Sequence, residues 1–157
     1  MAITVGEDTY VTVAEADTYF TTRYGYDLWD ALTEPNKESA LVSAAAQLDV
    51  MCLWYGSPSE DDQDMAFPRT PDADPTPQAI KDAQCEMAYS IVAAGSADVN
   101  AADPVTRLKA GDVELEFKVA GGQTSTLVND YTKNLLRGWG VCHYGTETAR
   151  VVPMARG

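Results

Sequence analysis

The chain has 157 residues, a formal net charge of −13 and an apolar fraction of 45%. One domain is the default for this length, and the aliphatic and aromatic content excludes a fully disordered chain. No stretch approaches the roughly 20 apolar residues that a membrane span needs. The first ten residues also lack the basic start and the apolar run of a signal peptide. We therefore expect a globular protein without a membrane partner.

The charge is unevenly distributed along the chain. Residues 1–105 contain 19 acidic and 4 basic residues, whereas residues 106–157 contain 5 acidic and 7 basic residues. An acidic body repels phosphate, so general nucleic-acid binding through residues 1–105 is disfavoured. Two interpretations stay open: the charge keeps the protein soluble, or it forms a surface that DNA passes without adhering.

Three cysteines, Cys52, Cys85 and Cys142, are widely spaced. Their odd number argues against a disulfide framework. Cys52 and Cys85 fall on helical patterns, so we predict buried thiols that act as small hydrophobic side chains. This usage indicates a protein made and kept in a reducing compartment.

Capping signals and apolar periodicity predict the first two helices. Thr12 and Glu15 have capping-box spacing, which begins a helix over 13–24 that Gly25 ends. The aromatic link 26–29 is predicted to hold one helical turn. Thr33, Glu34 and Pro35 then begin a second helix that ends at Gly56. Its apolar face consists of Leu41, Ala44, Ala45, Leu48, Cys52 and Tyr55.

A third helix is predicted from Thr76 as N-cap and Pro77 as first helical residue to Gly95. Its apolar stripe should pack on the second helix, with the first helix covering the seam. Between them, residues 57–76 hold four prolines and six acidic residues and are predicted to form a long loop anchored by Phe67 and Arg69. Such a loop is either a solvated excursion or a functional segment.

A β-hairpin is predicted near residues 105–120. Val113, Leu115, Phe117 and Val119 alternate with charged residues, which is typical of a strand with one buried face. Residues 106–109 are the expected partner, across a turn at 110–112. Because a lone hairpin is marginally stable, it must pack on the helices or pair with another chain.

The C-terminal part is predicted to contain a fourth helix, capped by Thr126 and ending before Gly138. Residues 139–157 show no clean period and are either a frayed terminus or an extended arm that docks on a partner. The predicted fold is therefore mainly α. About four bundled helices and the hairpin make up domain 1–138, and 139–157 form the arm. The residues expected to dock are Trp139, Val141, Tyr144, Arg150, Val151, Val152, Met154 and Arg156.

The sequence offers no set of residues that predicts catalysis or metal binding. His143 is the single histidine, and with Cys142 it gives two of the three or four ligands that a metal site needs. The acidic run at Asp61, Asp62 and Asp64 lacks the glycine and distal glutamate of a calcium loop. Gly121 and Gly122 are not followed by a phosphate-loop lysine. We expect no enzyme activity, no metal and no cofactor.

Short motifs occur in a defined order between residues 9 and 95. They are Tyr10–Tyr19, Trp29, Lys37–Leu41, Ala45–Asp49, Trp54 with Gly56, Ala66–Arg69, and Pro77–Ile80 leading to Ala83, Glu86 and Ala88. Together they resemble the head–tail connector, or adaptor, proteins of tailed bacteriophages, whose members are often named DnaT-like single-stranded DNA-binding proteins. The family usually has tryptophan where this chain has Phe67.

The resemblance implies an α-helical adaptor that forms a ring, commonly of twelve copies, beneath the portal protein. Such a ring extends the channel for double-stranded DNA and presents a surface to a tail or stopper protein. Its location would be the head–tail neck of the virion, after synthesis in the host bacterial cytoplasm. The resemblance further implies that the C-terminal arm reaches the portal.

Residue patterns fit this expectation, and two alternatives stay open. The hairpin offers strand edges to neighbouring copies, and the arm offers apolar side chains to the portal. The first alternative is a single-stranded DNA-binding module, for which Tyr131, Trp139 and Tyr144 are the stacking candidates. The second is an enzyme or an unrelated regulatory domain, which would need a ligand site that the sequence does not display.

Overall fold

The computed structural model describes residues 2–71, 75–95, 107–110, 113–116 and 128–143, with the backbone alone for 107–110 and 113–116. The described part is mainly helical, as predicted. Its helices are α1 (Val13–Thr21), α2 (Asp27–Asp30), α3 (Glu34–Met51), α4 (Gln78–Ala94) and α5 (Asp130–Leu136). Three antiparallel strand pairs accompany them: β1 (Cys52–Trp54) with β6 (Gly140–Cys142), β2 (Ser57–Pro58) with β3 (Arg69–Thr70), and β4 (Arg107–Ala110) with β5 (Val113–Glu116).

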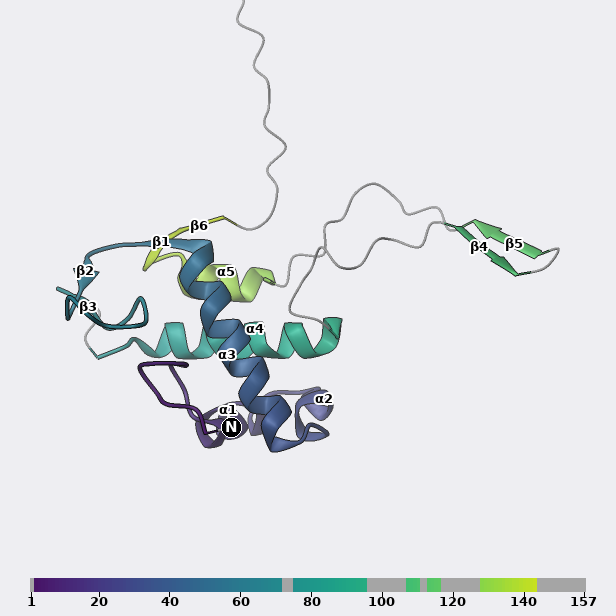
Figure 1. The fold of residues 1–157 in the computed structure, drawn as a ribbon, viewed down its shortest axis with the longest axis horizontal. Helices are drawn as coiled ribbons and strands as arrows, with labels where there is room; N and C mark the ends of the chain where they lie inside the picture. The colour runs from purple at the N-terminus through teal and green to yellow at the C-terminus, as the bar shows by residue number, and fades with distance from the viewer. Residues whose placement is uncertain (1, 72–74, 96–106, 111–112, 117–127, 144–157) are drawn as a thin grey trace, which may run out of the picture.

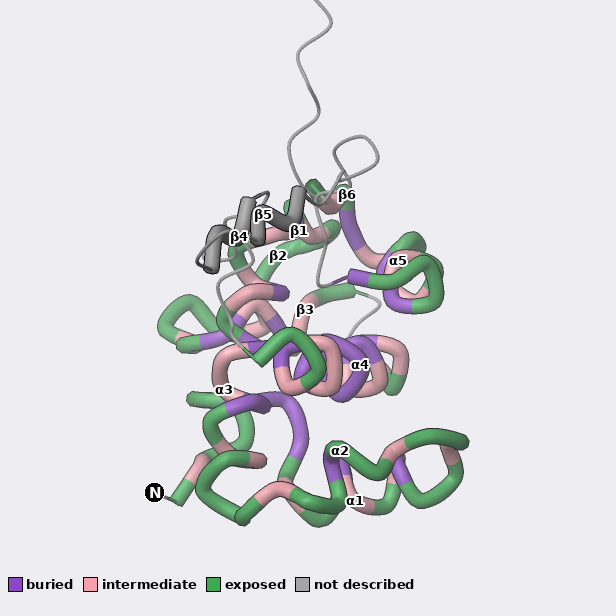
Figure 2. Tube along the Cα trace, turned by 90° about the vertical axis from the view of Figure 1, so that its right-hand side faces the viewer, coloured by how far each residue is buried: buried purple, intermediate pink, exposed green. Residues whose placement is uncertain are grey.

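Helix α4 is the centre of the helical body. It contacts α1, α2, α3 and α5, and α3 crosses it at a steep angle (Figure 1). The small side chains Ala44 and Ala45 of α3 are fully buried, which lets the backbones of crossing helices approach closely. Because α1 contacts both α3 and α4, the predicted arrangement of these three helices is confirmed. Burial is accordingly concentrated along α4 (Figure 2).

The first helix begins as predicted and ends earlier. Thr12 accepts a hydrogen bond from the Glu15 backbone N–H at 3.1 Å, and Glu15 accepts one from the Thr12 N–H at 2.7 Å, which completes the capping box. The helix ends at Thr21 rather than at residue 24. The hydroxyl groups of Thr21 and Thr22 bond to backbone carbonyls in the last turn, an interaction that competes with continued helix.

Helix α3 ends at Met51, so the prediction of a helix up to Gly56 is wrong. From Cys52 the backbone is extended and pairs with β6, and the ladder is prolonged by bonds from Tyr55 N to Trp139 O (2.9 Å) and from His143 N to Met51 O (3.0 Å). Gly140 makes this approach possible, because a Cβ there would lie 2.7 Å from the Leu53 carbonyl oxygen.

Two predicted caps differ from the observed ones. Pro77, rather than Thr76, is the N-cap of α4, and its carbonyl accepts bonds from Ile80 N and Lys81 N. Helix α5 is capped by Asn129, whose Oδ1 accepts a bond from Thr132 N at 2.8 Å. The predicted cap Thr126 lies outside the described residues. Gly95 ends α4, as predicted, and does so in the left-handed conformation (φ 73°).

The predicted hairpin is present, with slightly different bounds. Strand β4 begins at Arg107 and pairs with β5 across residues 111–112. Its register pairs each basic residue of β4 with an acidic residue of β5, and each apolar residue with an apolar one. The pairs are Arg107 with Glu116, Leu108 with Leu115, Lys109 with Glu114, and Ala110 with Val113.

Candidate functional site

All four basic side chains of residues 1–105 bond to other groups of the same chain. Three form ion pairs: Arg23 with Glu86 (2.6 Å), Lys37 with Asp17 (2.8 Å) and Lys81 with Glu15 (3.3 Å). The fourth, Arg69, donates to three backbone carbonyls. With 19 acidic residues in the same part of the sequence, the helical body offers phosphate few available cations and many carboxylates.

The Glu86 carboxylate joins three helices. It lies on α4, is only 4% exposed, and contacts Arg23 beyond the end of α1 at 2.6 Å. It also accepts hydrogen bonds from Tyr19 on α1 (2.5 Å) and from Asn129 at the start of α5 (3.5 Å). Burial, followed by the bond to Glu86, raises the pKa of the Tyr19 phenol, which therefore stays protonated and continues to donate. Arg23 also stacks 5.1 Å from the ring centroid of Tyr131 on α5.

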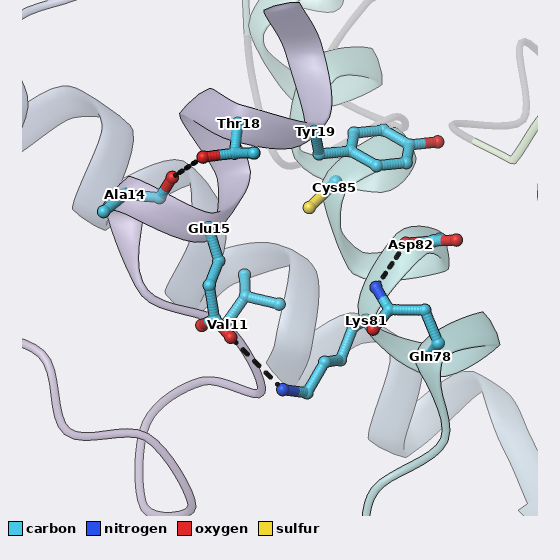
Figure 3. Close-up of a pocket in the computed structure, with 9 residues that line it drawn as sticks. All are labelled: Val11, Ala14, Glu15, Thr18, Tyr19, Gln78, Lys81, Asp82 and Cys85. Atoms are coloured by element: carbon cyan, nitrogen blue, oxygen red, sulfur yellow. Dashed lines mark hydrogen bonds and ion pairs between the residues drawn. The ribbon is translucent and has the colours of Figure 1, made fainter. Parts of the chain in front are cut away.

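A groove of about 410 Å³ lies between α1 and α4 (Figure 3). Figure 3 shows Lys81 reaching across it to Glu15, and Gln78 bonding to Asp82 on the same helix. Hydrogen bonds from Thr12, together with Lys81, lower the pKa of Glu15. The ion pair with Lys81 therefore persists at pH values below the ordinary pKa of glutamate. Two carboxylates against one paired lysine make this groove unfavourable for an anion.

One cysteine lies against the same groove. Cys85 on α4 is 2% exposed, and burial raises the pKa of its thiol well above the usual range. A protonated buried thiol is a poor nucleophile. Its predicted role as a small hydrophobic side chain agrees with this environment.

Phe67 and Arg69 hold the segment between β2 and β3 on the body. The Phe67 ring is 1% exposed and makes edge contacts with Trp54 (centroids 4.9 Å apart) and Tyr10 (6.0 Å). Beside it, Asp49 accepts bonds from the Tyr10 hydroxyl and from Ala66 N (3.0 Å). The guanidinium of Arg69 donates to the carbonyls of Tyr55, Gly56 and Ala66 at 2.7–3.0 Å.

Cys52 and Cys142 form a disulfide between β1 and β6. The prediction of a free thiol at Cys52 is therefore wrong, and the odd number of cysteines, which argued against a disulfide framework, leaves room for this single bridge. The two residues are 90 positions apart in sequence but directly opposite in the strand register, and only the pairing of two short strands brings them together. Cys85 is the free cysteine.

The outer face of the β1–β6 sheet exposes large apolar side chains. Leu53 and Val141 are opposite each other in the register and are 69% and 51% exposed. Tyr55, two residues after Leu53 and so on the same side of the extended chain, is 57% exposed. Val50, in the last turn of α3, is 89% exposed. We call Leu53, Tyr55 and Val141 the outer apolar face.

The structure describes two of the residues predicted to dock, and the others lie outside the described residues. Trp139 and Val141 belong to the body: Trp139 packs against the core, and Val141 lies in β6. Tyr144, Arg150, Val151, Val152, Met154 and Arg156 lie outside the described residues, as do the hairpin positions Phe117 and Val119. Val113 and Leu115 lie in β5. His143 directly follows β6.

Sequence reasoning missed the outer apolar face and the Glu86 cluster. Cys52 and Tyr55 also fit helical spacing, which concealed the alternation of buried Cys52 with exposed Leu53. Glu86 falls among the apolar positions of α4, where an acidic residue on the buried side was the available signal.

The described residues contain no candidate metal site and no candidate membrane-spanning helix. No group of three or more metal-ligating side chains converges within them. None of the helices described is both long and apolar enough to cross a membrane.

Fold and surface together define a small acidic protein with a mainly helical body, internally paired cations and an apolar face on a short sheet. The chain belongs to the family described as "Putative DnaT-like ssDNA binding protein", whose profile matches residues 2–157. That description names single-stranded DNA binding and does not name an adaptor. Searches of curated proteins and of solved structures gave no match.

Proposed function

We propose that this protein is a non-catalytic structural adaptor of a tailed bacteriophage, forming a ring under the portal that extends the DNA channel and joins the capsid to the tail. The observation that carries the proposal is the engagement of all four basic side chains of residues 1–105. A ring around moving DNA must not hold phosphate, and a body whose cations are all engaged internally, three of them by carboxylates, meets this requirement. The phage assignment itself rests on the resemblance of residues 9–95.

Surface chemistry supports a role in protein assembly. A closed ring needs two different complementary surfaces on each copy. The outer apolar face is one candidate surface, because clustered exposed apolar side chains mark interaction sites more often than scattered ones do. The hairpin, whose outer strand edges pair with no other described strand, is the second. The segment 144–157 would contact the portal.

The adaptor proposal is tested by imaging. Full-length protein mixed with the portal protein of the same phage should form rings on the portals in negative-stain micrographs. Deletion of residues 150–157 should reduce the decorated fraction, because Arg150, Val151, Val152, Met154 and Arg156 are removed. The truncated protein should unfold in urea at the same midpoint as the full chain. Bare portals with the full-length protein would contradict the adaptor proposal. Full decoration with the truncated protein would contradict the proposed role of the C-terminal arm in portal binding.

Single-stranded DNA binding is the second candidate function, and the family description favours it. Its cations would have to come mainly from residues 106–157, which contain 7 of the 11 basic residues. Within the described part of that region, Tyr131 is 47% exposed beside Arg23 and could stack on a base.

A salt titration separates the two candidates. If the protein is an adaptor, a fluorescent thirty-nucleotide oligo(dT) should show no saturable binding at 20 mM salt. A single-stranded DNA-binding protein would bind it at 20 mM salt, and its affinity would fall steeply towards 200 mM. Tyr131→Ala should weaken such binding, whereas Tyr24→Ala, an exposed tyrosine without this arginine contact, should not. Salt-sensitive binding that Tyr131→Ala weakens and Tyr24→Ala does not would contradict the adaptor proposal and support single-stranded DNA binding.

A further inference from the structure

We infer that the outer apolar face of the β1–β6 sheet receives the β4–β5 hairpin of a second copy of this chain. This inference rests on the proposed ring function and names the contact that closes the ring. The first observation is clustering: three of the eight large apolar side chains exposed in the described residues belong to this one face. Leu53 and Val141 form its centre as a directly opposed pair.

The receiving face is held rigidly before any partner arrives. The Cys52–Cys142 disulfide and the ladder bonds at Tyr55 and His143 fix the two strands to each other. The inner side of the sheet packs on the core through Trp54, whose ring contacts Phe67. A preformed surface of this kind loses little conformational entropy on binding.

The hairpin has the composition that the outer apolar face requires. Its register places Leu108 opposite Leu115 and Ala110 opposite Val113, so apolar pairs alternate with the charged pairs. The two apolar pairs occupy alternate positions of the ladder, and this register therefore places them on the same face of the hairpin. A two-stranded hairpin is marginally stable alone and gains from a partner surface.

Charge favours the hairpin over the helical body of a second copy. Two helical bodies repel each other, because residues 1–105 contain 19 acidic residues and 4 basic ones. Residues 107–118 contain three of each and are therefore neutral. The neutral hairpin can therefore approach an acidic neighbour without the repulsion that a second helical body would meet.

A second copy, rather than the same chain, is the inferred partner. Among the described strands, β4 and β5 pair with each other and not with β1 or β6. A contact between two different surfaces of neighbouring copies is also what generates a closed ring.

Isotope-resolved cross-linking tests the inference. A photo-reactive benzoylphenylalanine replaces Leu53, and equal amounts of ¹⁴N-labelled and ¹⁵N-labelled protein are mixed and irradiated. We expect cross-links from position 53 to residues 107–116 that join light to heavy chains. The same group at Val5, which is 47% exposed and lies outside the outer apolar face, should not give them. Cross-links to the hairpin within one isotope only, cross-links elsewhere, or none would overturn the inference.

A substitution pair provides a second readout. Leu53→Lys should weaken self-association in sedimentation equilibrium by roughly tenfold or more, and Val5→Lys should leave it unchanged. Equal effects of the two variants would contradict the inference. Its failure is distinguishable from failure of the adaptor function. If Leu53→Lys protein still decorates portals, the adaptor function holds and this contact is not part of it. If mixed-isotope cross-links form but portals stay bare, the contact exists and the adaptor function is wrong.

Discussion

Reduction of the Cys52–Cys142 disulfide is expected to lower the free energy of unfolding by about 3–4 kcal/mol. The bond joins residues 90 positions apart, and closing so long a segment removes much of the conformational entropy of the unfolded chain. It also connects the end of α3 to β6, which is otherwise held by a few ladder bonds. The measurement is urea unfolding followed by tryptophan fluorescence, with and without dithiothreitol.

A double variant is the matched control for this experiment. Cys52→Ser combined with Cys142→Ser should unfold at the low midpoint of the reduced protein and should not respond to dithiothreitol. Cys85 should not interfere while the protein is folded, because burial raises the pKa of its thiol and slows its reaction. Identical wild-type transitions with and without reductant, together with two newly titratable thiols, would contradict the prediction.

The helices were the most predictable part of the molecule, because their signals are local. The capping box at Thr12 and Glu15 and the terminal Gly95 are present with the predicted geometry. Errors occurred where side chains compete with the backbone for hydrogen bonds, as Thr21 and Thr22 do at the end of α1. Such competition depends on rotamers that a sequence pattern does not encode.

The β1–β6 sheet could not be predicted, because its partners are far apart in sequence and each strand is three residues long. No alternation can be recognised over three residues. The cysteine count was also misleading. An odd number argues against a framework of several bridges, but it allows one bridge and one free thiol. The outer apolar face depends on this sheet and was therefore not predicted either.

The charge pattern was readable at the level of composition but not of contacts. An excess of acidic residues in positions 1–105 was evident, whereas the pairing of each basic residue was not. Lys81 and Glu15 are 66 positions apart, and only the packing of α1 on α4 joins them. Contacts of this kind carry the functional argument, since they decide whether a cation is available to a ligand.

Phe67→Ala is expected to destabilise the protein by about 3–5 kcal/mol, because it removes a fully buried ring and leaves a cavity. The cavity would open between Trp54 and Tyr10, the two rings that Phe67 contacts. Phe67→Leu keeps most of the apolar volume and should cost less, about 1–2 kcal/mol. Urea unfolding of the two variants and the wild type measures both effects.

Limited proteolysis tells whether Phe67 acts as the anchor of the segment between β2 and β3 or as an ordinary core residue. As an anchor, its loss should speed cleavage within residues 59–66 more than cleavage within α4, under conditions in which the variant remains folded. Arg69→Met should speed the same cleavage, because it removes the three bonds to backbone carbonyls without opening a cavity. Uniform acceleration at every site in both variants would show that the segment opens only when the whole body unfolds, and Phe67 would then stabilise the body without holding this segment in particular.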